Sequence, residues 1–330
     1  MKVLITGVAG LIGSNFAEHL LKKNVEIVGI DNLSGGYKSN VHNDVIFYEL
    51  DLLSFEEVEK IIKQHSFDYI YHFAAYAAEG LSPFIRKFNY SNNLLCTTNL
   101  VNLAIKYNIK RFMFTSSMAT YGFGNNDGKA FTEETPQKPI DPYGIAKLAC
   151  EMDIKVASEQ HGLEYCIIRP HNVYGKNQNI WDRYRNVLGI WMYQLLHNED
   201  LTIYGTGEQT RAFSYIDDML EPLWNAAISE KAKNQEINLG GIYEFPLIEV
   251  SKILTKIVGK GNVKFLEGRH EVKHAYCSYQ KSIDILDFKM NVNLEEGLTK
   301  MWLWAQKQPE RERLKWDKYE LDKGIYSFWK

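Results

Sequence analysis

The feature that most constrains this chain is a glycine-rich turn near its start. The apolar run KVLIT at 2–6 leads into the turn, and apolar residues then recur every four positions, at Ile12, Phe16 and Leu20. A short β-rich run predicts a strand, and this recurrence predicts one face of a helix. The glycines of the turn and of the start of this helix are Gly7, Gly10 and Gly13. A strand, a glycine turn and a helix in this order predict a dinucleotide site, because amides at a helix N-terminus suit a pyrophosphate.

The rest of the first half alternates apolar runs with helical patterns. Further strands are predicted at 25–30, 45–50 and 68–73, with one ending near 116 and one ending at Arg169. Helices are predicted at 55–65, 83–107 and 142–161. This alternation predicts an α/β fold with a Rossmann-type, doubly wound parallel sheet.

The pattern changes after Pro170. Helices are predicted near 183–197, 217–229, 246–258 and 294–307, and short strands near 201–204 and 236–239. We therefore expect a dinucleotide-binding domain over 1–170, while 171–330 forms mainly a smaller α/β substrate lobe and a C-terminal tail. Late segments are free to return to the first domain. The lobe is expected to cover the carboxyl edge of the strands, where open α/β sheets bind ligands.

Composition narrows the choice of partner. The formal net charge is -3 and no long run of Lys or Arg occurs, which argues against nucleic acid and anionic membranes as partners. No apolar stretch approaches the roughly 18 to 20 residues of a membrane helix. Four scattered cysteines and nine histidines show no metal-ligand cluster and no secreted disulfide framework. These features predict a cytoplasmic, metal-free protein with a small-molecule partner.

The predicted cofactor is NAD. Asp31 ends the second strand, where its carboxylate suits a ribose diol. The same charge would repel the 2'-phosphate of NADP, although Lys38 lies nearby. The alternative for Asp31 is a simple turn residue. Other positions expected along the cofactor follow the strands or open the first helix: Leu11, Ile12, Asn32, Asp51, Leu52, Ala74 and Ala75.

A candidate chemical centre lies in the helix predicted at 142–161. Tyr143 and Lys147 are four residues apart and therefore share a helix face. A tyrosine with a pKa of about 10 is a poor base at neutral pH. One ammonium about 4 Å away contributes roughly 4 kcal/mol at an effective dielectric constant of about 20. Lys147 is therefore expected to lower the pKa of Tyr143, and the oxidised nicotinamide adds positive charge nearby. Ser117, from another strand end, is expected to share the substrate hydroxyl.

These motifs together resemble the extended short-chain dehydrogenases/reductases, and within them the sugar-nucleotide epimerases and dehydratases. The resemblance spans nearly the whole chain: TGVAGLIG at 6–13, DNLS at 31–34, HFAA at 72–75, SSMATYG at 116–122, PYGIAK at 142–147, RPHNVYG at 169–175 and IYGTGEQTRAFSYIDD at 203–218. It implies that Tyr143 is the base, that Lys147 also holds the nicotinamide ribose, and that Ser117 orients the reacting hydroxyl.

The same resemblance implies a nucleotide-diphosphate sugar as substrate. Asn172 and Arg211 resemble the family's diphosphate contacts, with Arg269 as a third. Delocalised cationic forks and amide donors suit a diphosphate. The resemblance also implies a homodimer formed through the helices at 83–107 and 142–161.

The residues after Ser117 bear on the reaction. The family's 4,6-dehydratases have acidic residues there, whereas this chain has Met118 and Ala119, which cannot transfer protons. The family's GDP-mannose 3,5-epimerases have a cysteine in place of Ala119. The leading hypothesis is a 4-epimerase of a UDP-hexose or derivative that oxidises C4 and returns the hydride. The alternatives are a dehydrogenase or ketoreductase with net redox change, and a non-catalytic NAD-sensing protein.

Several segments depart from the family pattern. TRAF at 210–213 stands where TRDF is common, and RHEVKHAYC at 269–277 replaces an arginine-proline-glycine-aspartate start, so a different sugar pocket is expected. Glu79, Arg86 and Lys87 in the segment at 76–89 are interpreted as a solvated helix start, with contact to an unusual sugar as the alternative. His171 is interpreted as a structural histidine. The aromatic residues of the last thirty positions are expected to pack against the lobe.

Overall fold

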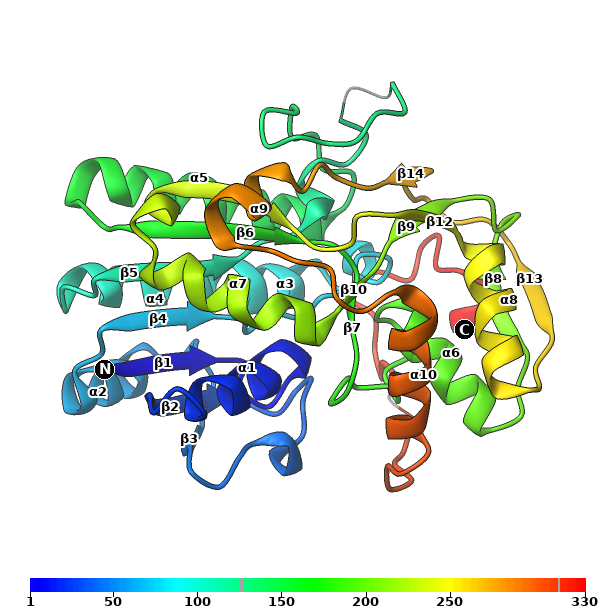
Figure 1. Ribbon diagram of the computed structural model, residues 1–330, viewed down its shortest axis with the longest axis horizontal. Coiled ribbons are helices and arrows are strands. Elements are labelled where there is room, and N and C mark those ends of the chain that lie inside the picture. The colour runs from blue at the N-terminus through cyan, green and yellow to red at the C-terminus, as the bar shows by residue number, and fades with distance from the viewer. Residues whose placement is uncertain (125–126, 314) are drawn as a thin grey trace.

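The computed structural model describes residues 1–124, 127–313 and 315–330. Its centre is a parallel sheet of seven strands in the order β11-β6-β5-β4-β1-β2-β3 (Figure 1). The strands are β1 (Lys2–Thr6), β2 (Glu26–Asp31), β3 (Ile46–Glu49), β4 (Tyr69–His72), β5 (Arg111–Thr115), β6 (Tyr165–Pro170) and β11 (Gln235–Leu239). The strand order reverses between β1 and β4, which is where doubly wound sheets bind ligands. The predicted Rossmann-type sheet is confirmed.

Helices cover both faces of the sheet (Figure 1). One face carries α1 (Leu11–Leu21), α7 (Ile216–Ile228) and α9 (Gln280–Leu286), and the other carries α2 (Phe55–His65), α4 (Cys96–Lys106) and α5 (Pro142–His161). Each layer has its own apolar core, with Phe16 and Leu223 buried on the first face and Val58 and Ile154 buried on the second. Burial on both faces explains why the strands read as continuous apolar runs.

The chain leaves the sheet after β6 and returns with β11. This strand pairs in parallel with β6, and Ile237 lies beside Ile168 in the register. Helix α7, also from the second half of the chain, packs against β5 and β6. The second half therefore supplies part of the sheet and of one helix layer as well as the smaller lobe.

The smaller lobe lies beyond the carboxyl ends of the strands (Figure 1). Its helices are α6 (Val187–Leu196), α8 (Leu247–Val258) and α10 (Leu294–Ala305). Its strand pairs and triplet contain β7 (Val173–Tyr174), β8 (Leu201–Tyr204), β9 (Thr210–Ala212), β10 (Ser214–Tyr215), β12 (Glu244–Pro246), β13 (Val263–Leu266) and β14 (His274–Ala275).

Helix α6 begins later than the predicted helix at 183–197. Asn186 has an extended backbone, with φ -70° and ψ 151°, and its side chain accepts a hydrogen bond from the Gly189 amide. This is an N-cap, because the amide oxygen satisfies a backbone donor of the first turn. The prediction was wrong for 183–186, and Tyr184, Arg185 and Asn186 line the cleft between sheet and lobe instead.

The helix predicted at 83–107 is interrupted. A short helix α3 (Arg86–Tyr90) runs through a π-helical turn at Ser91–Leu95 into α4. Asn93 lies in the π turn, and its side chain accepts a hydrogen bond from the Tyr76 amide at 2.9 Å and donates to the Tyr76 carbonyl at 3.2 Å. The wider turn thus fixes the backbone that follows β4.

The last aromatic residues pack against the segment after β4 as well as against the smaller lobe, so the expected packing on the lobe alone was incomplete. Ile325 and Trp329 are buried in a cluster with Tyr76, Leu81, Phe84 and Tyr184. The Trp329 and Tyr184 ring centroids are 5.1 Å apart, and the Tyr319 hydroxyl lies 3.0 Å from that of Tyr184. The segment 315–330 therefore contacts both sides of the cleft.

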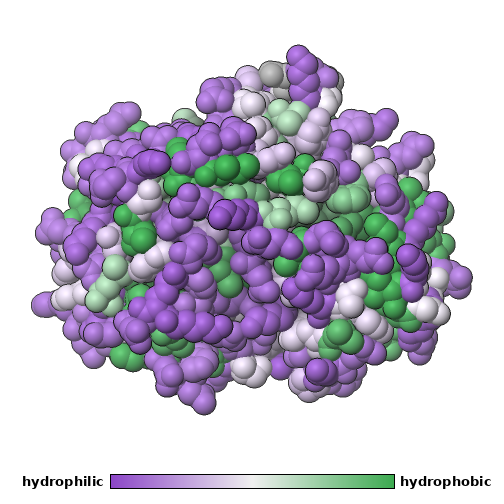
Figure 2. Space-filling model, viewed as in Figure 1, coloured by the Kyte–Doolittle hydropathy of each residue, from purple (hydrophilic) through white to green (hydrophobic). Residues whose placement is uncertain are grey.

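The surface is mixed. Figure 2 shows that on one face hydrophilic residues predominate and hydrophobic residues gather in separate groups. In the part of the chain that the structure describes, no helix is long and apolar enough to cross a membrane.

Candidate active site

One cleft lies between the carboxyl edge of the sheet and the smaller lobe. Every residue predicted for the site lines it: Gly7, Gly10, Leu11, Ile12, Gly13, Asp31, Asn32, Asp51, Leu52, Ala74, Ala75, Ser117, Tyr143, Lys147, Asn172, Arg211 and Arg269. They converge because parallel strands end at the same edge of the sheet.

The glycine turn fits a dinucleotide. Gly7 has φ +73°, and a Cβ placed on it would lie 2.6 Å from the Ala74 nitrogen. A Cβ on Gly13 would lie 2.2 Å from the Gly7 oxygen. Only glycine permits this close packing of the turn against α1 and the end of β4. Gly10 is the N-cap of α1, and no side chain accepts a hydrogen bond from the first turn there. The first amides of the helix are therefore suited to bind an anion such as a pyrophosphate.

Asp31 is held in place by the same turn. Its carboxylate accepts hydrogen bonds from the Ala9 amide at 3.0 Å and the Leu33 amide at 2.8 Å. A carboxylate has about four acceptor sites, so capacity remains for a ribose diol. Burial raises the pKa of Asp31, against the effect of these two amides. Lys38 is 70% exposed, and its ion pair among the described residues is with Glu49 at 4.0 Å. It is not among the described residues that line the cleft beside Asp31.

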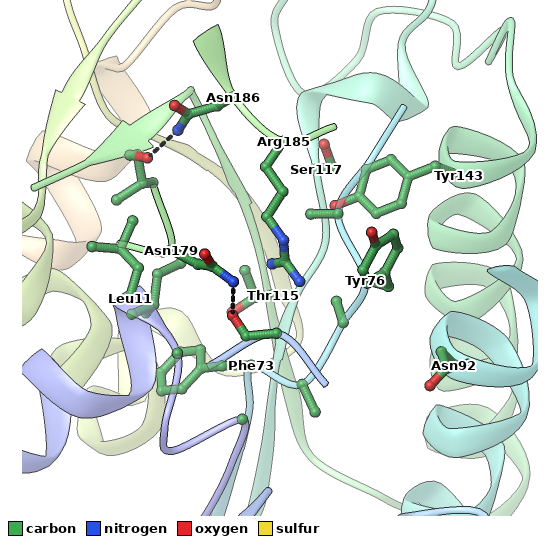
Figure 3. A pocket seen from close by; sticks show the side chains of 18 of the residues that line it. Leu11, Phe73, Tyr76, Asn92, Thr115, Ser117, Tyr143, Asn179, Arg185 and Asn186 are labelled. Carbon is green, nitrogen blue, oxygen red and sulfur yellow. Dashed lines mark hydrogen bonds between the residues drawn. The ribbon is translucent and has the colours of Figure 1, made fainter. Parts of the chain in front are cut away.

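The residues of the chemical centre come from two elements. Ser117 follows β5 and caps a 3-10 turn at Met118–Thr120. Tyr143 lies in the first turn of α5, whose N-cap Asp141 accepts a hydrogen bond from the Gly144 amide at 2.9 Å. Figure 3 shows the Tyr143 side chain pointing from α5 toward Ser117. Lys147 lies one turn later, with Nζ 5.9 Å from the centroid of the Tyr143 ring.

Burial dominates the electrostatics of the centre. Burial raises the pKa of Tyr143, Glu79 raises it further, and a hydrogen bond with Ser117 acts in the opposite direction. The Lys147 ammonium donates to the Thr115 carbonyl at 2.8 Å, and burial lowers the pKa of Lys147 to about 8. In the protein without cofactor the pKa of Tyr143 is raised and not lowered, because burial outweighs the other influences on it. The expected lowering, which included the charge of the oxidised nicotinamide, stays a prediction for the NAD complex.

The two predicted arginines meet on one carboxylate. Glu271 Oε2 lies 3.0 Å from Arg211 Nη2 and 3.1 Å from Arg269 Nη2. The Asn172 side chain donates to the carbonyl of Ala212 at 2.9 Å, next to Arg211 on β9. The structure therefore brings the three predicted diphosphate contacts to one end of the cleft. Sequence reasoning missed Glu271, although the departure from the family pattern at 269–277 pointed to this segment.

The interpretation of 76–89 as a solvated helix start holds for Arg86 and Lys87 but is incomplete for Glu79. Arg86, Lys87 and Glu79 are all exposed, as expected for a solvated helix start, but Glu79 also lines the cleft. Within the described residues its carboxylate has no ion pair at 4.0 Å or less. Burial and the charge of Glu79 raise the pKa of Asp141 to about 7. An acidic pair therefore flanks Tyr143.

His171 is fully buried behind the cleft. Its Nδ1 lies 3.3 Å from the carbonyl oxygen of Gly241, and burial lowers its pKa to about 4. His171 is therefore a neutral, buried imidazole that contacts the glycine pair at 240–241, which agrees with its interpretation as a structural histidine.

Comparison with known proteins places this geometry in a family. A profile of the NAD dependent epimerase/dehydratase family matches residues 3–240. The chain is 29% identical over 306 residues to a putative UDP-glucose 4-epimerase of Methanocaldococcus jannaschii, covering 92% of this chain and 98% of that protein.

Solved structures agree. UDP-glucose 4-epimerase of Thermotoga maritima with UDP-glucose superimposes with a TM-score of 0.87 at 30% identity, covering 93% of this chain and 99% of that one. UDP-glucuronic acid 4-epimerase of Bacillus cereus, in complex with UDP-glucuronic acid and NAD, gives 0.85 at 28% identity, with 93% and 99% covered. From the profile match, the shared fold and the convergence of the family's motifs on one cleft, we conclude that this chain belongs to the NAD-dependent epimerase/dehydratase family.

Proposed function

We propose that this protein is an NAD-dependent nucleotide-sugar 4-epimerase that acts on a UDP-hexose or a derivative. The observation that carries the proposal is the meeting of Ser117, Tyr143 and Lys147 in one cleft with the arginine pair Arg211 and Arg269. Similarity to UDP-sugar 4-epimerases over nearly the whole chain supports the same reaction.

The residues divide into three groups by proposed role. The glycine turn and the first turn of α1 would hold the cofactor pyrophosphate, Asp31 the adenosine ribose, and Lys147 the nicotinamide ribose. Bound NAD would supply the hydride acceptor for oxidation at C4 and, once reduced, the hydride donor for reduction on the opposite face of the sugar. Tyr143 removes the proton from the C4 hydroxyl, which Ser117 orients. Asn172, Arg211 and Arg269 would bind the sugar-nucleotide diphosphate.

The residues beside Ser117 favour epimerisation over dehydration. Met118 and Ala119 form the 3-10 turn that Ser117 caps, and neither side chain can donate or accept a proton. Met118 lines the cleft next to Ser117. An elimination across C5 and C6 would need an acid and a base at such positions, whereas C4 oxidation and reduction need only the Tyr143 centre.

Purified protein is expected to convert one nucleotide hexose of a UDP, GDP, CDP and dTDP panel, including hexuronates, into its C4 epimer. Products are followed by NMR, with nicotinamide absorbance in the same tube. Formation of the epimer without net NADH supports the proposal. Stoichiometric NADH with a keto sugar would make the protein a dehydrogenase, and absence of any conversion across the panel would refute the enzyme assignment.

The replacement Glu79→Gln is expected to shift the pH profile. Glu79 raises the pKa of Tyr143, so removing this like charge favours the phenolate and lowers that pKa. Since kcat/KM rises with pH as Tyr143 loses its proton, the rise is expected at lower pH in the variant than in the wild type. Asp141 ionises more readily without Glu79, but it affects Tyr143 less than Glu79 does.

The control for this shift is Glu79→Asp, which keeps the charge and is expected to leave the rise near its wild-type pH. The measurement is kcat/KM against pH for all three proteins with one substrate. A rise that moves to higher pH in Glu79→Gln, or that moves equally in both variants, would contradict the role given to the Glu79 charge.

Two further features support a cytoplasmic homodimer. Ile145, Met152 and Val156 are 43%, 60% and 46% exposed along one side of α5, which is an apolar stripe of the kind that pairs helices of two subunits. The four cysteines are buried and free, which suits a reducing compartment.

A further inference from the structure

Arg185 is a cleft residue that sequence reasoning missed. It lies in the segment between β7 and α6, just before the helix cap Asn186, and its side chain reaches from the lobe into the cleft (Figure 3). The guanidinium carbon is 4.8 Å from the centroid of the Tyr76 ring. Arg185 Nε donates to Asp182 Oδ2 at 2.9 Å, and the Asp182 side chain is fully buried.

The local contacts hold Arg185 in one orientation. The second oxygen of Asp182 accepts a hydrogen bond from the Tyr184 amide at 3.0 Å, and the Tyr76 hydroxyl also donates to Asp182, at 3.3 Å. The carboxylate that anchors Arg185 is thus itself fixed by two neighbours. An arginine positioned in this way is pre-organised to bind a ligand.

Most of the guanidinium donors have no partner. Arg185 Nη2 is buried without a hydrogen bond, and within the described residues Nη1 has none either. A guanidinium has five N–H donors, of which only the Nε donor is used. Nη2 is enclosed by protein, whereas Nη1 is not, and its two N–H donors remain available at the cleft that Arg185 lines. Nη1 therefore points to an anion that binds in the cleft.

The surroundings of Nη2 indicate which anion. A Cβ on Gly35 would lie 2.2 Å from Arg185 Nη2, so the guanidinium rests on the backbone of this residue. A Cβ on Gly36 would lie 2.3 Å from the Ala9 oxygen, so the Gly35–Gly36 turn packs on the glycine turn before α1. Arg185 is therefore on the side of the cofactor turn, whereas Arg211 and Arg269 are gathered on Glu271.

We propose that Arg185 binds the pyrophosphate of NAD. The amides at the N-terminus of α1 would contact the phosphates from the sheet side, and Arg185 would contact them from the lobe side with the two N–H donors of Nη1, as charge-assisted hydrogen bonds. In this proposal the lobe and the sheet both contact the cofactor pyrophosphate. This inference rests on the cofactor of the family and not on the reaction at C4.

The test measures release of NAD rather than turnover. Protein loaded with labelled NAD is chased with excess ADP-ribose, and the dissociation rate is compared for wild type, Arg185→Met, Arg185→Lys and Arg86→Met. Loss of a charge-assisted hydrogen bond predicts about 30-fold faster release from Arg185→Met, with a smaller increase for Arg185→Lys. Arg86 is exposed and outside the cleft, so Arg86→Met should release NAD at the wild-type rate.

Two comparisons separate phosphate binding from other effects. UDP affinity is expected to stay within about twofold of wild type in Arg185→Met, and added salt should accelerate NAD release less in this variant than in the wild type. Unchanged NAD release with weakened UDP binding would overturn the proposal in favour of the substrate diphosphate. Unchanged release with unchanged UDP binding would overturn it outright.

A variant that purifies without NAD is titrated with NAD and with adenosine. Weaker binding of NAD alone supports the phosphate contact, and an equal loss for both would overturn it, since that indicates a collapsed site. If Arg185→Met does not fold, Arg185→Gln takes its place, and wild-type release from that variant refutes the contact. Epimerase activity is not a readout here, so failure of this proposal leaves the C4 reaction untouched.

Discussion

Replacing Tyr143 with Phe is expected to lower kcat by about 1000-fold or more while NAD stays bound. The substitution removes only the phenol oxygen, and general acid–base groups contribute about 100- to 10,000-fold to a rate. Tyr143 is buried and packed near Lys147, so the ring of Phe keeps the packing. In the cleft only the proton acceptor that faces Ser117 is lost.

The measurement compares turnover and NAD content for Tyr143→Phe and Tyr243→Phe. Tyr243 is 59% exposed and outside the cleft, and its variant should match the wild type in both. A Tyr143→Phe protein that retains NAD and more than about a tenth of wild-type kcat would remove the tyrosine from its role as base. Loss of NAD along with activity would instead give Tyr143 a binding role.

The replacement Glu151→Ala is expected to lower the free energy of unfolding by about 3–5 kcal/mol. Glu151 on α5 and Arg169 on β6 form an ion pair with side chains 0% and 2% exposed, joined at 2.6 Å. The Glu151 carboxylate also accepts hydrogen bonds from Ser116 and Gln137. Without it the Arg169 charge stays buried and uncompensated, which costs more than the pair itself contributes.

The free energy of unfolding is measured by urea denaturation. The control is the double variant that combines Glu151→Leu with Arg169→Met. The double variant removes both charges and keeps apolar volume, so it is expected to be more stable than Glu151→Ala. A loss below about 1 kcal/mol in the single variant, the range of an exposed pair, would contradict the burial argument. Because this pair anchors α5 beside Ser116, reduced activity is expected to accompany the loss of stability.

The cleft could be predicted from sequence because its parts follow strand ends. Gly7 follows β1, Asp31 ends β2 and Ser117 lies two residues after β5. Parallel strands bring such residues to one edge. Spacing along α5 likewise placed Tyr143 and Lys147 on one helix face. Spacing does not report burial, however, and burial is what raises the pKa of Tyr143 in the protein without cofactor.

The residues missed by sequence reasoning depend on tertiary contacts. Arg185 fell inside a predicted helix. Because the helix begins only after the cap at Asn186, Arg185 lies before it, and its side chain reaches the cleft. Glu79 reads as a solvated charge until the fold places it beside Tyr143. Glu271 has no local pattern that would reveal its bridging of Arg211 and Arg269.

The return of the chain to the sheet at β11 has a consequence for how the protein folds. Strand β6 is an edge strand until β11 pairs with it, and the segments that form β7 to β10 and α6 lie between them in sequence. Closing this long loop costs entropy before the pairing is made, and such non-local contacts slow folding. Until that step is complete, β6 exposes unpaired backbone groups that favour association with other chains. The sheet and the lobe are therefore expected to reach their native structure in one cooperative transition rather than as two independent units.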